Sequence, residues 1–143
     1  MRIYSIFNIR KEYQSFIFGR ERMLLEMVAT REHSSQESSV SKELSFICEP
    51  FNSSCVKGDI FNQLQDRFPN VHLVGDYINI QHQLKGEIKI KLFTYYIEAA
   101  CEGSRMLDLD LFQILGQIND SFLAFNKEEA ECGWLKPIKH LTY

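Results

Sequence analysis

Apolar side chains alternate at the start of the chain. Ile3, Phe7 and Ile9 would point to one side of an extended backbone, while Tyr4, Ile6 and Asn8 would point to the other. Alternation with a period of two indicates a β-strand. A strand that is apolar on both faces is typical of the middle of a sheet, where both faces are covered. The pattern therefore predicts a central strand over residues 2–9.

The period then changes to that of a helix. Apolar and long side chains recur at spacings of three and four residues, at Tyr13, Phe16, Ile17, Arg20, Leu24, Met27 and Val28. Such a stripe predicts a helical region over 11–31, and Gly19 within it favours a bend because glycine is a poor helix former. Residues 32–41 follow with five serines. This polar segment predicts a mobile loop.

The remaining pattern alternates between helical and strand segments. A short helix is predicted over 42–48, ended by Pro50, because the residue before a proline avoids the helical region. Further helices are predicted over 56–68 and 107–118, and strands over 71–74, 77–83, 87–92, 95–101 and 122–125. This order lacks the strict strand–helix alternation of a doubly wound sheet. It favours an α+β fold in one domain spanning 1–143, with several helices packed on an antiparallel or mixed β-sheet.

Composition and charge narrow the class of protein. The chain has a net charge of −3, whereas binding to DNA phosphates requires clustered Lys and Arg. We therefore expect no direct DNA binding. No apolar run approaches the ~20 residues of a membrane helix, and the apolar start is too short for a signal peptide. We expect a cytoplasmic protein without a membrane partner, whose four cysteines are free thiols, with Cys48 and Cys101 in the core.

Motifs that carry catalytic chemistry are missing from the sequence. It contains no phosphate-binding loop, no nucleophile elbow and no cysteine or histidine spacing typical of zinc. Asp108 and Asp110 could hold a divalent ion, but negative charge at the start of a helix is the simpler interpretation. We therefore expect no enzyme activity, no cofactor and no metal.

The first helix is unusually rich in large apolar side chains. Tyr13, Phe16, Ile17 and Phe18 lie within six residues, and one helix face cannot bury all four. Either some of them form a protein-binding surface, or neighbouring helices cover the other side. Trp134 is interpreted as an anchor for the C-terminal segment, because Gly133 and Pro137 around it are typical of an ordered turn.

Four segments of the chain, in the same order, resemble the SirA family. They are Ile17-Phe18-Gly19-Arg20-Glu21, the segment from Lys42 to Pro50, Phe122-Leu123-Ala124, and Gly133-Trp134-Leu135-Lys136-Pro137-Ile138-Lys139. The last segment is similar to a Gly-Trp-Leu-Asn-Pro-Val-Lys tail in that family. The members are sporulation inhibitors of replication in Gram-positive, spore-forming bacteria.

This resemblance implies a function and a partner. It implies a non-enzymatic inhibitor that binds the N-terminal domain of the replication initiator DnaA and blocks initiation of chromosome replication during sporulation. The family's contact positions fall on Tyr13, Ile17, Glu43 and Pro137 of this sequence. Ile17 and Glu43 stand where the family often has Tyr and Gln.

Two other functions stay open on the residues alone. A small-ligand sensor, or an enzyme, would use a pocket between sheet and helices lined by His72, His82 or Cys101. A structural subunit would instead use the aromatic first helix for self-association.

Overall fold

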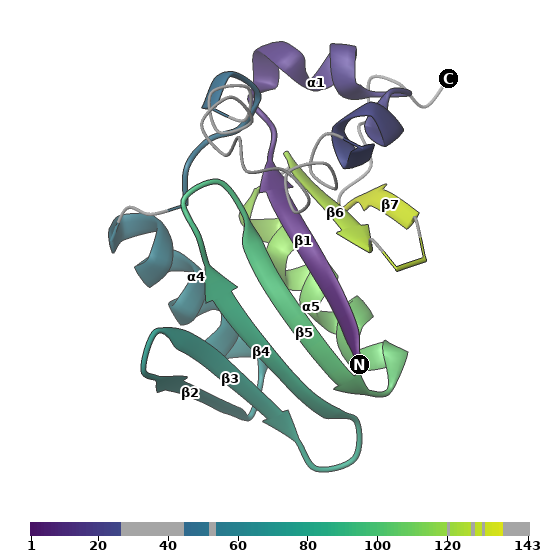
Figure 1. Ribbon diagram of the computed structural model, residues 1–143. Helices are drawn as coiled ribbons and strands as arrows, with labels where there is room; N and C mark the ends of the chain where they lie inside the picture. The colour runs from purple at the N-terminus through teal and green to yellow at the C-terminus, as the bar shows by residue number, and fades with distance from the viewer. Residues whose placement is uncertain (27–44, 52–53, 120, 127, 130, 136–143) are drawn as a thin grey trace.

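The computed structural model describes residues 1–26, 45–51, 54–119, 121–126, 128–129 and 131–135. The predicted loop at 32–41 lies outside the described residues, and so do Glu43 and Pro137. The helices and strands named by label in Figure 1 are, in chain order, β1 (Arg2–Asn8), α1 (Lys11–Ile17), α4 (Ser54–Arg67), β2 (Asn70–Val74), β3 (Tyr77–His82), β4 (Gly86–Leu92), β5 (Ile97–Gly103), α5 (Arg105–Ile118), β6 (Phe122–Asn126) and β7 (Glu131–Trp134).

The strands form one seven-stranded sheet in the order β2-β3-β4-β5-β1-β6-β7 (Figure 1). Every neighbouring pair is antiparallel. β1 lies between β5 and β6, so the first strand of the chain is inserted between strands that come much later. The predicted α+β class is confirmed, with an antiparallel rather than a mixed sheet, and the predicted central position of the first strand is confirmed with it.

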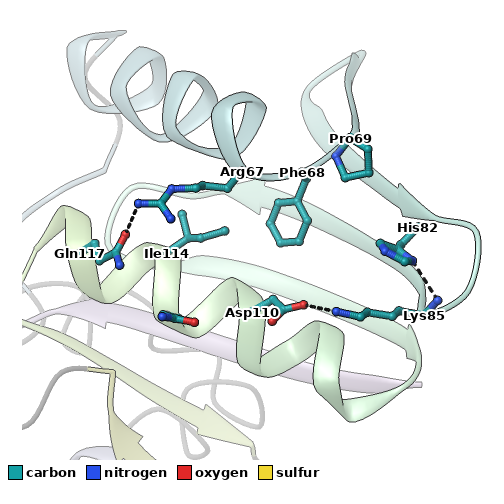
Figure 2. A pocket seen from close by; sticks show the side chains of 9 residues that line it. Arg67, Phe68, Pro69, His82, Lys85, Asp110, Ile114 and Gln117 are labelled. Atoms are coloured by element: carbon teal, nitrogen blue, oxygen red, sulfur yellow. Dashed lines mark hydrogen bonds and ion pairs between the residues drawn. The ribbon is translucent and has the colours of Figure 1, made fainter.

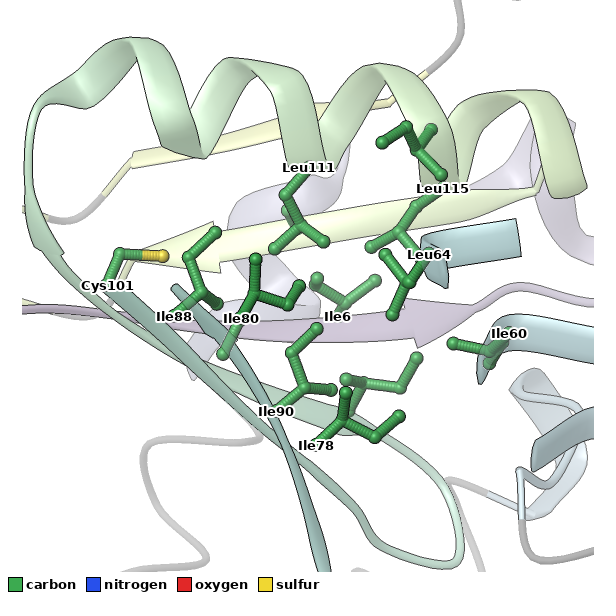
Figure 3. Packing of buried hydrophobic residues seen from close by; sticks show 14 of the residues in the cluster. Ile6, Ile60, Leu64, Ile78, Ile80, Ile88, Ile90, Cys101, Leu111 and Leu115 are labelled. Atoms are coloured by element: carbon green, nitrogen blue, oxygen red, sulfur yellow. The ribbon is translucent and has the colours of Figure 1, made fainter. Parts of the chain in front are cut away.

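The two faces of the sheet carry separate hydrophobic clusters. On one face α4 and α5 cover a larger cluster that includes Ile6, Ile88 and Leu111 (Figure 3). On the other face a smaller cluster, which we call the second cluster, joins Phe7 of β1 to Ile17 of α1. Tyr4 and Ile6 of β1 enter the larger cluster and Phe7 enters the smaller one, because successive side chains of a strand point to opposite faces. The apolar character of β1 on both sides is explained by this double burial.

Two predicted elements differ from the structure. The first helix does not run from 11 to 31 with a bend, because α1 ends at Ile17 and a second helical stretch covers residues 21–26. Gly19 separates them with a φ of +87°, a conformation that no helix contains. The turn expected around Gly133 is instead the edge strand β7, which pairs with β6. Residues 131–134 show no regular alternation of apolar and polar side chains. Their strand conformation therefore follows from pairing with β6.

A buried ion pair links the chain start to α5. Asp108 is 2% exposed. Its carboxylate accepts a hydrogen bond from Arg2 Nε at 2.6 Å and one from the Tyr4 hydroxyl at 2.8 Å. The interpretation of Asp108 as helix-start charge is therefore incomplete: it does lie in the first turn of α5, but it holds that helix to β1. Asp110 points elsewhere, to Lys85 Nζ at 2.8 Å.

The environment of Asp108 also sets several protonation states. Burial by itself raises the pKa of Asp108, but the hydrogen bonds from Arg2 and Tyr4 outweigh it, so the pKa is below its usual value. Burial and the hydrogen bond to Asp108 raise the pKa of Tyr4 to about 12. Burial raises the pKa of the Cys101 thiol well above its usual value. Cys48, Cys101 and Cys132 are free thiols, as expected, and the first two are buried.

We predict that Asp108→Asn destabilises the fold. The substitution removes the charge to which the partly exposed Arg2 and the Tyr4 hydroxyl donate hydrogen bonds, which costs about 2 kcal/mol at neutral pH. The matched control is Asp110→Asn on the same helix, whose partly exposed pair with Lys85 contributes at most about 1 kcal/mol. Urea unfolding at pH 7 measures both. Equal stability of the two variants would contradict the structural role of Asp108.

The same pair predicts a pH dependence. Because the folded pKa of Asp108 is lowered, its stabilisation is complete above the unfolded value of about 3.9 and is lost as the pH falls through the folded pKa. The difference in free energy of unfolding between the wild type and Asp108→Asn should therefore shrink at acidic pH. A difference that stays constant on acidification would argue against an ionised Asp108 in the fold.

Candidate protein-binding surface

Several large apolar side chains are exposed around α1. Phe16 is 49% exposed, Phe18 43%, Met23 46% and Phe46 67%. All four belong to α1 or to the segments beside it, which together cover the second cluster. We call these four residues the apolar surface. Exposed aromatic groups of this kind are the usual centres of protein–protein contacts.

Side chains on the inner side of the same segments hold this surface in place. Ile17 is 0% exposed, Leu24 1% and Leu25 7%, and all three pack with Phe7 and Phe125 of the sheet. The backbone reverses between α1 and residues 21–26 because Gly19 adopts a positive φ. Inward packing on both sides of this turn leaves Phe16 and Phe18 on the outside.

Arg20 fixes the position of Phe16. Its Nη1 donates a hydrogen bond to the Phe16 carbonyl at 2.8 Å, and its guanidinium carbon lies 4.9 Å from the centre of the Phe16 ring. A cation over an aromatic face is attracted by the ring quadrupole. The ring and the backbone carbonyl of Phe16 are therefore both in contact with the Arg20 guanidinium, which holds this side chain in place.

Arg10 connects α1 to the segment that carries Phe46. Its guanidinium donates to Glu49 Oε1 at 3.0 Å and to the Ser45 carbonyl at 3.2 Å, and its backbone N–H donates to the Ile47 carbonyl at 2.8 Å. A further bridge joins Ile9 to Cys48. These contacts attach the segment bearing Phe46 to the start of α1.

Trp134 of β7 attaches residues 21–26 to the sheet. Its indole N–H donates to Glu21 Oε2 at 3.0 Å, and its ring packs against the second cluster. The interpretation of Trp134 as an anchor agrees with this contact. Gln14 of α1 donates in the same way to the hydroxyl of Ser121 just before β6. Helix α1 and residues 21–26 are therefore tied to the β6–β7 end of the sheet.

The two described residues that were expected to contact a partner differ from each other in exposure. Tyr13 is partly exposed and packs on the second cluster, whereas Ile17 is completely buried within it. A buried Ile17 can support the apolar surface from beneath but cannot touch a partner. Phe46 and Met23 were missed by sequence reasoning, since each lies in a helical pattern that equally fits a core position. Glu43 and Pro137 lie outside the described residues.

The residues of the ligand-sensor alternative do not come together. His72 is exposed and lies opposite Asn79, on the sheet face away from α5, while Cys101 is buried on the α5 face. His82 lies at the end of β3, where its Nδ1 faces the following turn. Among the described residues, no three His, Cys, Asp or Glu side chains are grouped to hold a metal ion. No helix within the described ranges has the length and apolar character needed to cross a membrane.

Comparison with known proteins relates the chain to one protein family. A family model described as "Sporulation inhibitor of replication protein SirA" matches residues 2–139. A protein of Bacillus subtilis (strain 168) with the same description is 22% identical over 153 residues, which cover 99% of this chain and 98% of the relative.

We predict opposite effects for two glycine substitutions. Gly19→Ala places a side chain at a φ of +87°, which costs about 1 kcal/mol. Gly58→Ala introduces a side chain with nothing within 4 Å, in the interior of α4, where alanine is favoured by up to about 1 kcal/mol. Urea unfolding of both variants measures the difference. A Gly19→Ala variant as stable as the wild type would remove the conformational reason for the turn that presents Phe16 and Phe18.

Proposed function

Because this chain belongs to the SirA family of sporulation inhibitors of replication, we propose that it inhibits initiation of chromosome replication by binding the N-terminal domain of the initiator DnaA through the apolar surface. The family relationship supports the process. The resemblance of the Phe18-Gly19-Arg20-Glu21 and C-terminal segments to family motifs supports the partner. The proposed mode of action is occupation of a protein surface, which requires no catalytic residue.

The single observation that carries the proposed surface is the exposure of three phenylalanines on an otherwise well-packed layer. Phe16, Phe18 and Phe46 are each at least 43% exposed, while the side chains beneath them are buried. Burying the exposed part of one such ring contributes on the order of 1 kcal/mol. The surface is held by Gly19, Arg10 and Arg20, so little ordering entropy opposes binding. These features favour a preformed contact centre.

The contact list implied by the family resemblance changes in one respect. Tyr13 stays in the proposed interface as a partly exposed neighbour of the apolar surface, and Glu43 and Pro137 stay as proposed contacts. Ile17 is assigned a supporting role, because its side chain is buried. An Ile17→Arg substitution would therefore disrupt the second cluster rather than report on binding.

We predict that Phe16→Gln weakens binding to the isolated DnaA N-terminal domain by at least about tenfold, the effect of ~1.4 kcal/mol. The matched control is Leu109→Gln, because Leu109 is 63% exposed on a helix that covers the opposite face. It should bind like the wild type. Calorimetric titration of each purified protein into the domain measures affinity, and circular dichroism confirms folding.

Three results would overturn the proposal or part of it. Absence of saturable binding by the wild type would remove DnaA as the partner. Equal affinities for Phe16→Gln and Leu109→Gln would move the interface away from α1. Concentration-dependent mass in sedimentation, abolished by Phe16→Gln, together with no binding to DnaA, would assign the apolar surface to self-association.

A further inference from the structure

Strand β2 forms one end of the sheet, so within the described ranges one of its two edges is unpaired (Figure 1). A free edge presents backbone N–H and C=O groups that can pair with another strand, and proteins usually protect such edges with charged side chains, proline or a bulge. β2 has the sequence Asn-Val-His-Leu-Val and contains no Lys, Arg, Asp, Glu or Pro. By contrast, β7 at the other end of the sheet carries Glu131. The edge of β2 is therefore the less protected of the two.

The exposed side chains of β2 are also apolar. Leu73 is 66% exposed and Val74 42%. Leu73 lies opposite Ile78, which is buried in the larger cluster, so Leu73 points to the same face of the sheet. Beside it is an open hollow of about 360 Å³ between α4 and the β2–β3 hairpin, lined on its apolar side by Phe61 and Leu92. The larger cluster is therefore left uncovered at this margin.

The turn of the hairpin determines which residues of β2 direct their backbone groups outward. A two-residue turn joins β2 to β3 directly after Val74. The pair that closes such a turn is hydrogen-bonded, and bonded and non-bonded pairs then alternate along the two strands. Every second residue, counted back from Val74, therefore bonds to β3. Val71 and Leu73 are the residues between them, and they direct their N–H and C=O groups to the free edge.

One register lets β2 pair along its whole length with β2 of a second copy of the chain. An antiparallel pair of identical strands is related by a two-fold axis. An axis at His72 sets Val71 opposite Leu73 of the second copy, so that two outward-directed residues meet. An axis at Val71 would set Leu73 opposite Pro69, which joins α4 to β2 (Figure 2) and has no N–H. An axis at Leu73 would set Val71 opposite Gly75, which belongs to the turn and has a φ of +62°.

The register centred on His72 also matches the side chains. Val71 and Leu73 lie on the α4 face, where Val71 packs against the larger cluster. Val71 and Leu73 of both copies would form one apolar patch on that face, because the axis is perpendicular to the sheet. On the other face His72 would lie opposite His72 of the second copy. This central pair is non-bonded, and in such pairs the facing side chains are closest to each other.

We propose that two copies of this chain form a symmetric dimer through β2, in an antiparallel pair centred on His72. Val71 and Leu73 exchange backbone hydrogen bonds across the axis, and Leu73 becomes covered. One strand edge and one small apolar patch make a limited interface, so the dimer is reversible. The apolar surface stays free in this dimer, because its segments pack on β1 and β6, which are distant from β2 in the strand order.

The test uses sedimentation equilibrium of the full chain. The wild type should show a mass that rises with concentration from that of one chain towards that of two, across micromolar concentrations. His72→Glu sets two carboxylates opposite each other, where like charges are destabilising, and should weaken dimerisation at least about tenfold. Gln113→Glu is the matched control, because it adds the same charge at an exposed position of α5. It should dimerise like the wild type, and circular dichroism confirms the folding of both variants.

A mixing experiment tests the register itself. His72→Lys should weaken dimerisation as His72→Glu does, because two ammonium groups then face each other. An equal mixture of the two variants should dimerise at least as tightly as the wild type, since opposite charges meet at the centre of the pair. The other registers of this strand pair do not set position 72 opposite itself, so this recovery is specific to the proposed axis.

Several outcomes would overturn the dimer. They are a wild type that stays monomeric up to about 1 mM, equal dimerisation of His72→Glu and Gln113→Glu, or no recovery on mixing. Dimers that Phe16→Gln abolishes and His72→Glu does not would place self-association on the apolar surface instead. Both variants at position 72 should bind the DnaA N-terminal domain like the wild type. Failure of the dimer and failure of the proposed function are therefore separate results.

Discussion

The structure depends on the burial of β1 from both sides. This strand pairs with β5 on one edge and β6 on the other, and its side chains enter both hydrophobic clusters. Side chains of β1 and of β6 enter both clusters, so the layer of α4 and α5 and the layer of α1 are connected through these two strands. The Arg2–Asp108–Tyr4 contacts lock the position of α5 on this strand, with Asp108 almost completely withdrawn from water.

The second cluster is small, and this constrains the layer that covers it. Helix α1 has only seven residues, too short to be stable by itself in water. It is held by Ile17 beneath it, by Arg10 to the segment at 45–49, and by Gln14 to Ser121. A layer this thin cannot cover every apolar side chain that it carries. Exposed phenylalanines are the consequence, and they make this layer the candidate for protein binding.

The candidate protein-binding surface lies on the face of the sheet that the second cluster covers. The apolar surface offers aromatic area and little charge, which fits a protein partner.

Local pattern alone determined much of this protein. The alternation around Ile6 and Phe7 was sufficient to predict a central strand, and the spacing of Leu107, Leu111 and Leu115 was sufficient to predict α5, because these periods follow from backbone geometry. The family resemblance rested likewise on short segments. Only the tertiary structure decided that Asp108 pairs with Arg2, that residues 131–134 become a strand, and which of Phe16, Ile17 and Phe18 is buried. Each of these depends on partners distant in sequence, and periodicity within one segment contains no information about what the rest of the chain places beside it.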